Sequence, residues 1–457
     1  MSEFTPLREA VDTLASRTPS PDFGQLKRRA TRRGRRRVVM AAVATAAVIA
    51  GSALAVTGLD DGRRTAPVVQ PNPGPAPNGW IVVDADQGDS GATRRGLGDG
   101  DIYLVRPGEQ AHRLEVAGSD AANEACPVWS PDGTRLLFGR LTGSSDTTSS
   151  DAELVIVPVG QNGTAGTPTV IGLDGFEVLG DGAEEGFDSH PCGTWAPDGR
   201  WVALAGTGEV WVVDTQTGAI RHLSDLRPSD LEWRPGTDEL AIAGDMGRDR
   251  GDPRTLSTPV TVYSVSTGEL RQLGSVEAAE ITWSPDGTSL AYTGGELEPE
   301  TRELGLVDGD GANEQSLVAD IGPTMHGIGP VWSPTGDRIA YQRCESGPDV
   351  EPHGEVCTGE RHEVVLVSVA DGTETVIGPP KTEGHEWYPF TVSWSPDGTT
   401  LLYWAWNLDD ETLPDGVIAV PADIPSDATV LIDAIDLVGN YSSHRWAPIQ
   451  MWGRQPG

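Results

Sequence analysis

Carboxylates dominate the chemically active side chains of this sequence. The 457 residues include 68 Asp and Glu against 33 Lys and Arg, which gives a formal net charge of −35. Such a charge repels nucleic acid and favours cationic ligands or basic partner surfaces. We therefore predict a protein or peptide partner, a cell-envelope component being one form of it, and no nucleic acid.

The carboxylates concentrate in two stretches, residues 173–190 and 294–303, and a third stretch, 385–390, sets aromatic rings beside a carboxylate. Aromatic anchors next to charged groups are typical of protein or peptide recognition. The alternative is that Trp387 and Phe390 pack under their own loop. The candidate binding residues are Asp174, Glu177, Asp181, Glu184, Glu185, Asp188, Glu296, Glu298, Glu300, Trp387 and Tyr388.

Motifs for catalysis or metal binding are missing from the sequence. There is no G-x-S-x-G elbow, and the eight His residues include no H-E-x-x-H pair. The stretch 308–314 resembles a calcium loop but lacks the Glu at the twelfth position, so we interpret it as a turn. We predict no catalytic residue, no cofactor and no metal site.

Four cysteines offer disulfide chemistry. Cys344 and Cys357 flank one long loop, and we expect them to pair. Cys126 and Cys192 each stand three residues before a Trp of a repeated motif, so they occupy equivalent positions in adjacent repeats and could also pair. Four cysteines allow three connectivities. Disulfides would place this part of the chain in an oxidising compartment.

The repeated motif is Trp-Ser-Pro-Asp-Gly, complete or degraded, and it recurs about 50 residues apart, which indicates a repeat architecture. Apolar residues precede the Trp and alternate after the Gly, a pattern that predicts two strands joined by a tight turn. The Asp residues of the motif are then turn residues. The motif Trp residues are Trp129, Trp195, Trp233, Trp283, Trp332, Trp394 and Trp446, and the turn Asp residues are Asp132, Asp198, Asp286 and Asp397.

Each repeat continues with two more strands, for example 210–213 and 220–223. Four antiparallel strands per repeat make one propeller blade. The motif and the strands that follow it resemble the WD40-like repeat of the TolB family, which is also found in the propeller domains of prolyl-oligopeptidase-type peptidases. The resemblance covers about residues 80–457. It implies an all-β propeller and leaves the function open, because propellers perform many unrelated tasks.

We predict seven blades, with six, as in the TolB family, as the alternative. Strands at 80–83, 101–105 and 112–116 precede the first motif, whereas Trp446-Ala447-Pro448 supplies an inner strand and too few residues follow it to build a whole blade. Pairing of these N-terminal strands with the C-terminal strand would close the ring and remove exposed sheet edges.

A basic segment and an apolar segment precede the propeller. Residues 1–37 end in an Arg-rich run, residues 38–59 carry no charge, and residues 60–79 form a Pro-rich linker. We predict a single transmembrane α-helix at 38–59, with a cytoplasmic N-terminus and anionic lipid at the basic segment. The alternative is a signal peptide cleaved near Ala53-Leu54-Ala55. In both cases the propeller, residues 80–457, is extracytoplasmic.

Loop lengths predict where a partner binds. The turns between first and second strands and between third and fourth strands are short, whereas the long insertions all fall between second and third strands or between blades. One face of the propeller is therefore elaborated, and it is acidic. We predict a non-enzymatic membrane protein that binds a partner through this face. The rival is an extracytoplasmic hydrolase or carbohydrate-active propeller with carboxylates at the channel mouth.

Overall fold

The computed structural model divides the chain into two units, Met1–Thr65 and Ala66–Gly457. All described residues belong to the second unit. The structure describes residues 78–86, 100–106, 109–119, 122–142, 151–176, 191–206, 209–224, 228, 230–243, 258–297, 300–321, 329–344, 362–377, 387–407, 416–423, 429–433 and 452–454.

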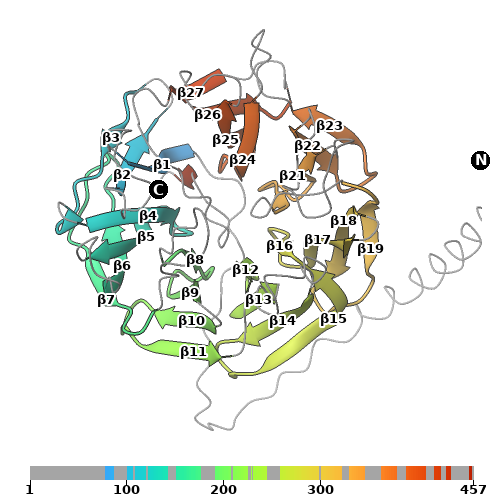
Figure 1. The fold of residues 1–457 in the computed structure, drawn as a ribbon, viewed down its shortest axis with the longest axis horizontal. Helices are drawn as coiled ribbons and strands as arrows, with labels where there is room; N and C mark the ends of the chain where they lie inside the picture. Colours follow the sequence, from blue (N-terminus) through green and yellow to red (C-terminus); the bar gives the residue numbers. More distant parts are fainter. Residues whose placement is uncertain are drawn as a thin grey trace, which may run out of the picture. The chain divides into compact units, whose positions relative to one another are not determined.

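Seven antiparallel sheets of four strands each stand in a ring (Figure 1), so the all-β fold has seven blades and not six. Blade 1 joins β28 (Trp452–Arg454), β1 (Asn78–Asp86), β2 (Gly100–Val105) and β3 (His112–Arg113). Blade 2 holds β4 (Ala122–Trp129), β5 (Arg135–Thr142), β6 (Asp151–Pro158) and β7 (Thr169–Gly172). Blade 3 holds β8 (Gly193–Trp195), β9 (Trp201–Gly206), β10 (Glu209–Asp214) and β11 (Ile220–Ser224).

The other four blades follow the same order from the inside of the ring to the outside. Blade 4 holds β12 (Asp230–Trp233), β13 (Glu239–Ala243), β14 (Thr258–Ser264) and β15 (Leu270–Ala278). Blade 5 holds β16 (Glu280–Trp283), β17 (Ser289–Leu297), β18 (Glu300–Asp308) and β19 (Gln315–Val318). Blade 6 holds β20 (Val331–Trp332), β21 (Arg338–Cys344), β22 (His362–Ser368) and β23 (Glu374–Ile377). Blade 7 holds β24 (Trp387–Trp394), β25 (Thr400–Asn407), β26 (Gly416–Pro421) and β27 (Thr429–Asp433).

The two ends of the propeller close the ring as predicted. The C-terminal strand β28 pairs antiparallel with β1, and Ile81 lies opposite Trp452. Asn78 also bonds the turn of blade 7, because its side chain donates to Asp397 Oδ2 at 3.0 Å and accepts from the Asp397 amide at 3.2 Å. The closing strand begins at Trp452, whereas residues 446–448, from which we expected it, lie outside the described residues.

The motif Asp residues shape the turns between first and second strands. Asp286 Oδ1 accepts bonds from Ser284 Oγ at 2.6 Å and from the Thr288 amide at 3.0 Å. Gly287 adopts a φ of 67°, a conformation that only glycine adopts easily. Partial burial raises the pKa of Asp286, but the bonds outweigh it and the net pKa is lowered. The predicted turn role is confirmed, and equivalent bonds occur at Asp132, Asp198 and Asp397.

Motif Trp side chains fill the interfaces between neighbouring blades. Each hydrophobic cluster combines residues of two adjacent sheets, so the core lies between the blades. Four of these Trp residues also donate their indole N–H to a main-chain carbonyl of the preceding blade. The pairs are Trp195 with Val128 at 3.3 Å, Trp233 with Thr194 at 3.1 Å, Trp332 with Thr282 at 3.2 Å, and Trp394 with Val331 at 3.2 Å.

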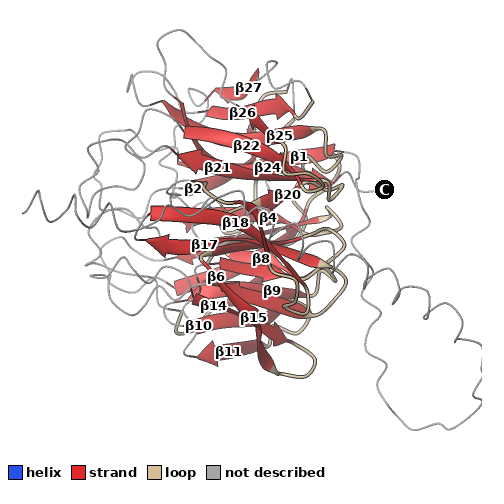
Figure 2. Cartoon of the chain, turned by 90° about the vertical axis from the view of Figure 1, so that its right-hand side faces the viewer, coloured by secondary structure: helices blue, strands red, loops and turns tan. Residues whose placement is uncertain are grey.

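Seen from the side, the described tight turns gather at one end of the strands (Figure 2). Antiparallel pairing places the starts of the inner strands at the opposite end. Among the described residues no helix is long and apolar enough to cross a membrane. The predicted cytoplasmic segment, transmembrane helix and nearly all of the linker, residues 1–77, lie outside the described residues.

Candidate functional site

The predicted binding residues are only partly described. Asp174 is exposed in the turn after β7. The acidic stretch 294–303, predicted to be a long insertion, is largely part of two strands. β17 and β18 pair with each other as far as Leu297 and Glu300, so Glu296 and Glu300 lie in this two-stranded ribbon. A Cβ at Gly294 would lie 2.5 Å from the Glu277 carbonyl oxygen, so the glycine that suggested a loop instead permits close strand packing.

The predicted aromatic loop also contains a strand. Trp387 and Tyr388 begin β24 and lie opposite Asn407 and Trp406 of β25. Their side chains, and those of Glu296 and Glu300, are not described. The remaining candidates lie outside the described residues: Glu177, Asp181, Glu184, Glu185, Asp188 and Glu298.

The structure draws attention to a different set, the residues three positions before each motif Trp, which we call the minus-three positions. Cys126 lies within β4, and the others stand at or just before the start of an inner strand, away from the tight turns. In blades 2 to 6 they are Cys126, Cys192, Asp230, Glu280 and Gly329. The minus-three residues of neighbouring blades therefore lie next to one another around the ring.

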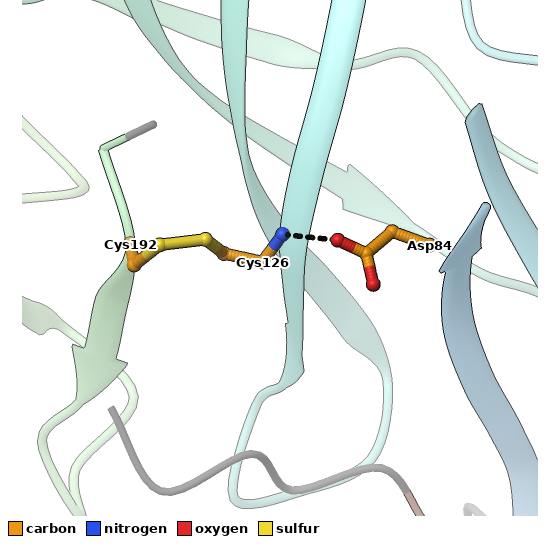
Figure 3. The surroundings of a disulfide bond; sticks show 3 residues. All are labelled: Asp84, Cys126 and Cys192. Atoms are coloured by element: carbon orange, nitrogen blue, oxygen red, sulfur yellow. Dashed lines mark hydrogen bonds between the residues drawn. A yellow bond between two sulfur atoms is a disulfide. The ribbon is translucent and has the colours of Figure 1, made fainter. Parts of the chain in front are cut away.

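Cys126 and Cys192 form a disulfide between blades 2 and 3, as predicted (Figure 3). Their Cα atoms are 5.2 Å apart, and each residue is 3 % exposed. The Cys126 amide donates to Asp84 Oδ2 of blade 1 at 3.2 Å. Cys344 ends β21 opposite His362, and Cys357 lies outside the described residues, so the second disulfide stays a prediction.

Blades 4 and 5 meet through carboxylates. Asp230 Oδ2 accepts a bond from the Ile281 amide at 2.8 Å, and Asp230 Oδ1 accepts one from the Leu231 amide at 2.8 Å. Glu232 lies two residues further along β12, and the Trp283 amide of β16 acts to lower its pKa. Both carboxylates are half-buried and reach from one inner strand to the main chain of the next.

Glu280, the minus-three residue of blade 5, adds a third carboxylate. It is 6 % exposed, and its Oε2 accepts a bond from Thr293 Oγ1 at 2.6 Å. The next minus-three residue is Gly329, where a Cβ would lie 3.1 Å from Glu280 Cβ and 3.8 Å from Asp230 Oδ2. Glycine at this position therefore leaves room beside the two carboxylates. We call Asp230, Glu232 and Glu280 the inner carboxylate cluster.

Electrostatics make the cluster unusual. Burial, helped by the nearby Glu280 charge, raises the pKa of Asp230 to about 7 although the bond from the Ile281 amide opposes the shift. Burial also raises the pKa of Glu232 well above its ordinary value, and Asp230 adds to that shift. Among the described residues no Lys or Arg forms a salt bridge with Asp230 or Glu232. The cluster therefore fits a proton or a cationic group better than an anion.

In blade 2 a buried carboxylate is paired with an arginine. Glu124 Oε1 accepts bonds from Ser119 Oγ at 2.6 Å and from Arg140 Nε at 2.9 Å, and Arg140 is itself 3 % exposed. Burial raises the pKa of Glu124, while these bonds and the Arg140 charge lower it in part. Glu124 thus has an arginine partner within its own blade, whereas Asp230 and Glu232 form no salt bridge with a described Lys or Arg.

The described part of the chain contains no group of three or more His, Cys, Asp or Glu side chains placed to hold a metal ion. The calcium-like stretch forms the β18–β19 turn, in which the Asp308 amide donates to the Ala312 carbonyl at 2.9 Å, as the turn interpretation predicted. Our sequence interpretation missed the inner carboxylate cluster. Alignment of the repeats on their Trp residues would have placed Asp230 and Glu280 beside one another, just as it did the cysteines.

Fold and site together define a seven-bladed β-propeller whose inner strands carry one disulfide and one carboxylate cluster. No protein-family model matches the sequence, and no curated protein matches it either. Many solved structures are similar to it.

These structures include TolB from Acinetobacter baumannii, at 14% identity over 76% of this chain and 78% of that one, with a TM-score of 0.39. They also include the oligogalacturonate lyase of Vibrio parahaemolyticus, at 14% identity over 78% and 87% of the two chains, with a TM-score of 0.43. The propeller domain of the Trilobed protease from Pyrococcus furiosus is 13% identical over 68% and 83%, with a TM-score of 0.44. TolB, expected from the motif, is thus among the similar structures, and the set mixes enzymes with non-enzymes.

Proposed function

We propose that the protein is a membrane-anchored, non-enzymatic binding module whose propeller captures a protein, a peptide or a cell-envelope component that carries basic groups. The inner carboxylate cluster carries the proposal. Asp230 begins β12 at the end away from the tight turns, Glu232 lies two residues further on, and neither forms a salt bridge with a described Lys or Arg. A cationic partner group would supply the missing counter-charge.

We also assign the acidic stretch 173–190 to this face, from its position in the sequence. It connects β7 with β8, and interblade connections enter the inner strands at this end. Before it, Phe176 is buried with its ring centroid 5.4 Å from that of Trp211. After it, Cys192 is held by the disulfide. Both ends of the stretch are therefore fixed to rigid elements, as in many binding loops.

The proposal places the propeller outside the cytoplasm, with residues 38–59 as the membrane anchor and residues 1–37 inside, in contact with anionic lipid. Cys126 and Cys192 support this location, because disulfides persist in oxidising compartments. Protease added outside intact cells should digest the propeller and spare residues 1–37. An N-terminus beginning near residue 56 in the mature protein would favour a cleaved signal peptide instead.

Binding is tested with three versions of the full chain and a Lys- and Arg-rich peptide as probe. In the first variant Glu177, Asp181, Glu184, Glu185 and Asp188 become Gln or Asn. In the matched control the exposed turn-side residues Glu269, Asp310 and Asp371 become Gln or Asn. We expect the wild type and the control to bind with salt-dependent affinity, and the first variant to bind at least about tenfold more weakly. Equal affinity of all three would contradict the proposed binding face.

Asp230 and Glu280 also favour a second candidate, a carboxylate-based hydrolase or carbohydrate-active enzyme. A carboxyl with a pKa near 7 beside another carboxylate is an arrangement that general acid catalysis uses. Turnover of an oligosaccharide or peptide panel that disappears in Asp230→Asn would support this candidate over the binding module. Binding without turnover would favour the module.

A further inference from the structure

Of the seven blades that the structure describes, only blade 1 has first and second strands that no turn connects. Its inner strand β28 and its second strand β1 lie far apart in the sequence, and they pair at Asn78 with Arg454 and at Ile81 with Trp452. In the other six blades a short turn joins the two strands within one segment of the chain. Closure of the ring therefore depends on non-covalent bonds at blade 1.

A pair of side-chain bonds supports this closure. Asn78 Nδ2 donates to Asp397 Oδ2 at 3.0 Å, and Asn78 Oδ1 accepts a bond from the Asp397 amide at 3.2 Å. Asp397 Oδ1 is engaged within its own turn, by Ser395 Oγ at 2.6 Å and by the Thr399 amide at 3.0 Å. Among the described residues, no other motif Asp accepts a bond from a side chain of another blade. We call the pair the Asn78–Asp397 latch.

The latch joins an amide to an ionised carboxylate. Partial burial raises the pKa of Asp397, but the bonds that its carboxylate accepts outweigh burial and the net pKa is lowered. The carboxylate is therefore ionised at neutral pH, and a hydrogen bond to a charged group is stronger than one between neutral groups. A carboxylate in place of the Asn78 amide would remove the donor and bring two like charges together.

Asn78 is followed by Gly79, and an Asn-Gly pair is chemically reactive. The glycine nitrogen attacks the side-chain carbonyl carbon of the asparagine, which expels ammonia and forms a cyclic imide. Water then opens the imide to aspartate or isoaspartate. Glycine favours the attack because it has no Cβ beside the nitrogen. The sequence contains one other such pair, Asn162-Gly163, which lies in the β6–β7 turn of blade 2.

We propose that Asn78 is a deamidation site whose reactivity is controlled by closure of the ring. In the closed ring, the two bonds to Asp397 and the extended backbone of β1 keep the Asn78 side chain from the Gly79 nitrogen. Opening of blade 1 breaks these bonds and permits the attack. The product carries a carboxylate that repels Asp397, so a ring that has opened and reacted closes less firmly. The reaction needs only water and does not depend on the proposed binding function.

Peptide mapping of the full chain tests the control by closure. The chain is incubated at mildly alkaline pH, folded or in guanidinium, and deamidation is followed at Asn78 and Asn162. In the unfolded chain both should react at similar rates, since both precede glycine. In the folded chain Asn78 should react at least about tenfold more slowly than in the unfolded chain, because a bond to a charged group lowers the open population by about that factor. Equal rates at Asn78 in the two states would overturn the proposal.

A variant without the latch assigns the protection to Asp397. Asp397→Ala should speed deamidation at Asn78 at least about tenfold in the folded chain and leave the rate at Asn162 unchanged. Asp286→Ala is the matched control, because Asp286 makes the same bonds within its own turn and none to another blade. It should leave the rate at Asn78 unchanged. An equal increase in both variants would refute the latch.

Asn78→Asp reproduces one product of the reaction and tests its effect on the ring. Hydrogen exchange of β28 should be at least about tenfold faster than in the wild type, relative to exchange of β16 and β17 in the same chain. Asn162→Asp, an exposed change at the other Asn-Gly pair, should leave the exchange of β28 as it is. Unchanged protection of β28 in Asn78→Asp would contradict the proposed loss of closure.

Discussion

Two interfaces of the same ring bring equivalent inner-strand positions together through different chemistry, a disulfide at one and carboxylates at the other. Between blades 2 and 3 the minus-three residues are Cys126 and Cys192, joined covalently. Between blades 4 and 5 they are Asp230 and Glu280, where one charge raises the pKa of the other. The repeat keeps the backbone positions equivalent, so the side chain alone decides whether an interface is locked or responsive. A propeller can therefore vary its rigidity around the ring without changing its fold.

The largest difference between the two interfaces should come from removing the disulfide. It closes a chain separation of 66 residues, and the loss of chain entropy alone predicts a cost of about 4 kcal/mol. We expect Cys192→Ala to lower the free energy of unfolding by about this amount in guanidinium titrations. Cys344→Ala measures the contribution of the predicted second disulfide separately, and the reduced wild-type protein should match the double variant Cys192→Ala with Cys344→Ala. A change below about 1 kcal/mol would mean that the disulfide contributes little to the locked interface.

Replacement of a carboxylate at the interface of blades 4 and 5 should raise the free energy of unfolding, whereas removal of the disulfide lowers it. Asp230→Asn removes a charge whose pKa is raised from 3.8 to about 7, and we expect it to stabilise the protein by about 2 kcal/mol at pH 8 after allowance for solvent screening. At pH 4 the folded wild type keeps the proton and the unfolded chain, with a pKa of 3.8, is only partly ionised, so the gain should be small. Thermal or chemical unfolding from pH 4 to pH 8 measures this profile. A gain that is independent of pH would indicate a packing effect rather than titration.

The blades and their order around the ring could be predicted from the sequence, but the side-chain chemistry of the two interfaces only in part. The tight turns and alternating strands are local signals, and the strands before Trp129 had to find a C-terminal partner, which predicted closure with seven blades. Equivalent positions in adjacent repeats predicted the Cys126–Cys192 pair. The same alignment applied to Asp230 would have found the carboxylate cluster.

Other features resist prediction because they depend on contacts between blades. Two adjacent glycines, Gly294 and Gly295, are typical of a loop, yet β17 continues through both, and the Glu277 carbonyl lies too close to Gly294 for a larger side chain. Likewise the missing indole bond of Trp283 follows from how blades 4 and 5 meet, and the sequence of its motif is a complete Trp-Ser-Pro-Asp-Gly copy.

A smaller effect separates the indole bonds of two neighbouring interfaces. Trp233 donates to the Thr194 carbonyl at 3.1 Å, whereas Trp283 has no acceptor in the described residues. Replacement by Phe removes similar volume at both positions but a hydrogen bond only at the first. We expect Trp233→Phe to cost about 1 kcal/mol more than Trp283→Phe in equilibrium unfolding. Equal costs would argue that the interface of blades 4 and 5 has an indole acceptor after all.

The smallest expected effect concerns the backbone of the locked interface. Cys126 has a φ of 59°, in the left-handed region that residues other than glycine rarely adopt, and its amide donates to Asp84. The disulfide and this bond hold the residue there. In a Cys192→Ala background the disulfide is gone, so Cys126→Gly should be more stable than Cys126→Ala by about 0.5 to 1 kcal/mol. If alanine were equal or better, the strand would have relaxed out of the left-handed region once the disulfide was removed, and the locked interface would owe its backbone geometry to the disulfide alone.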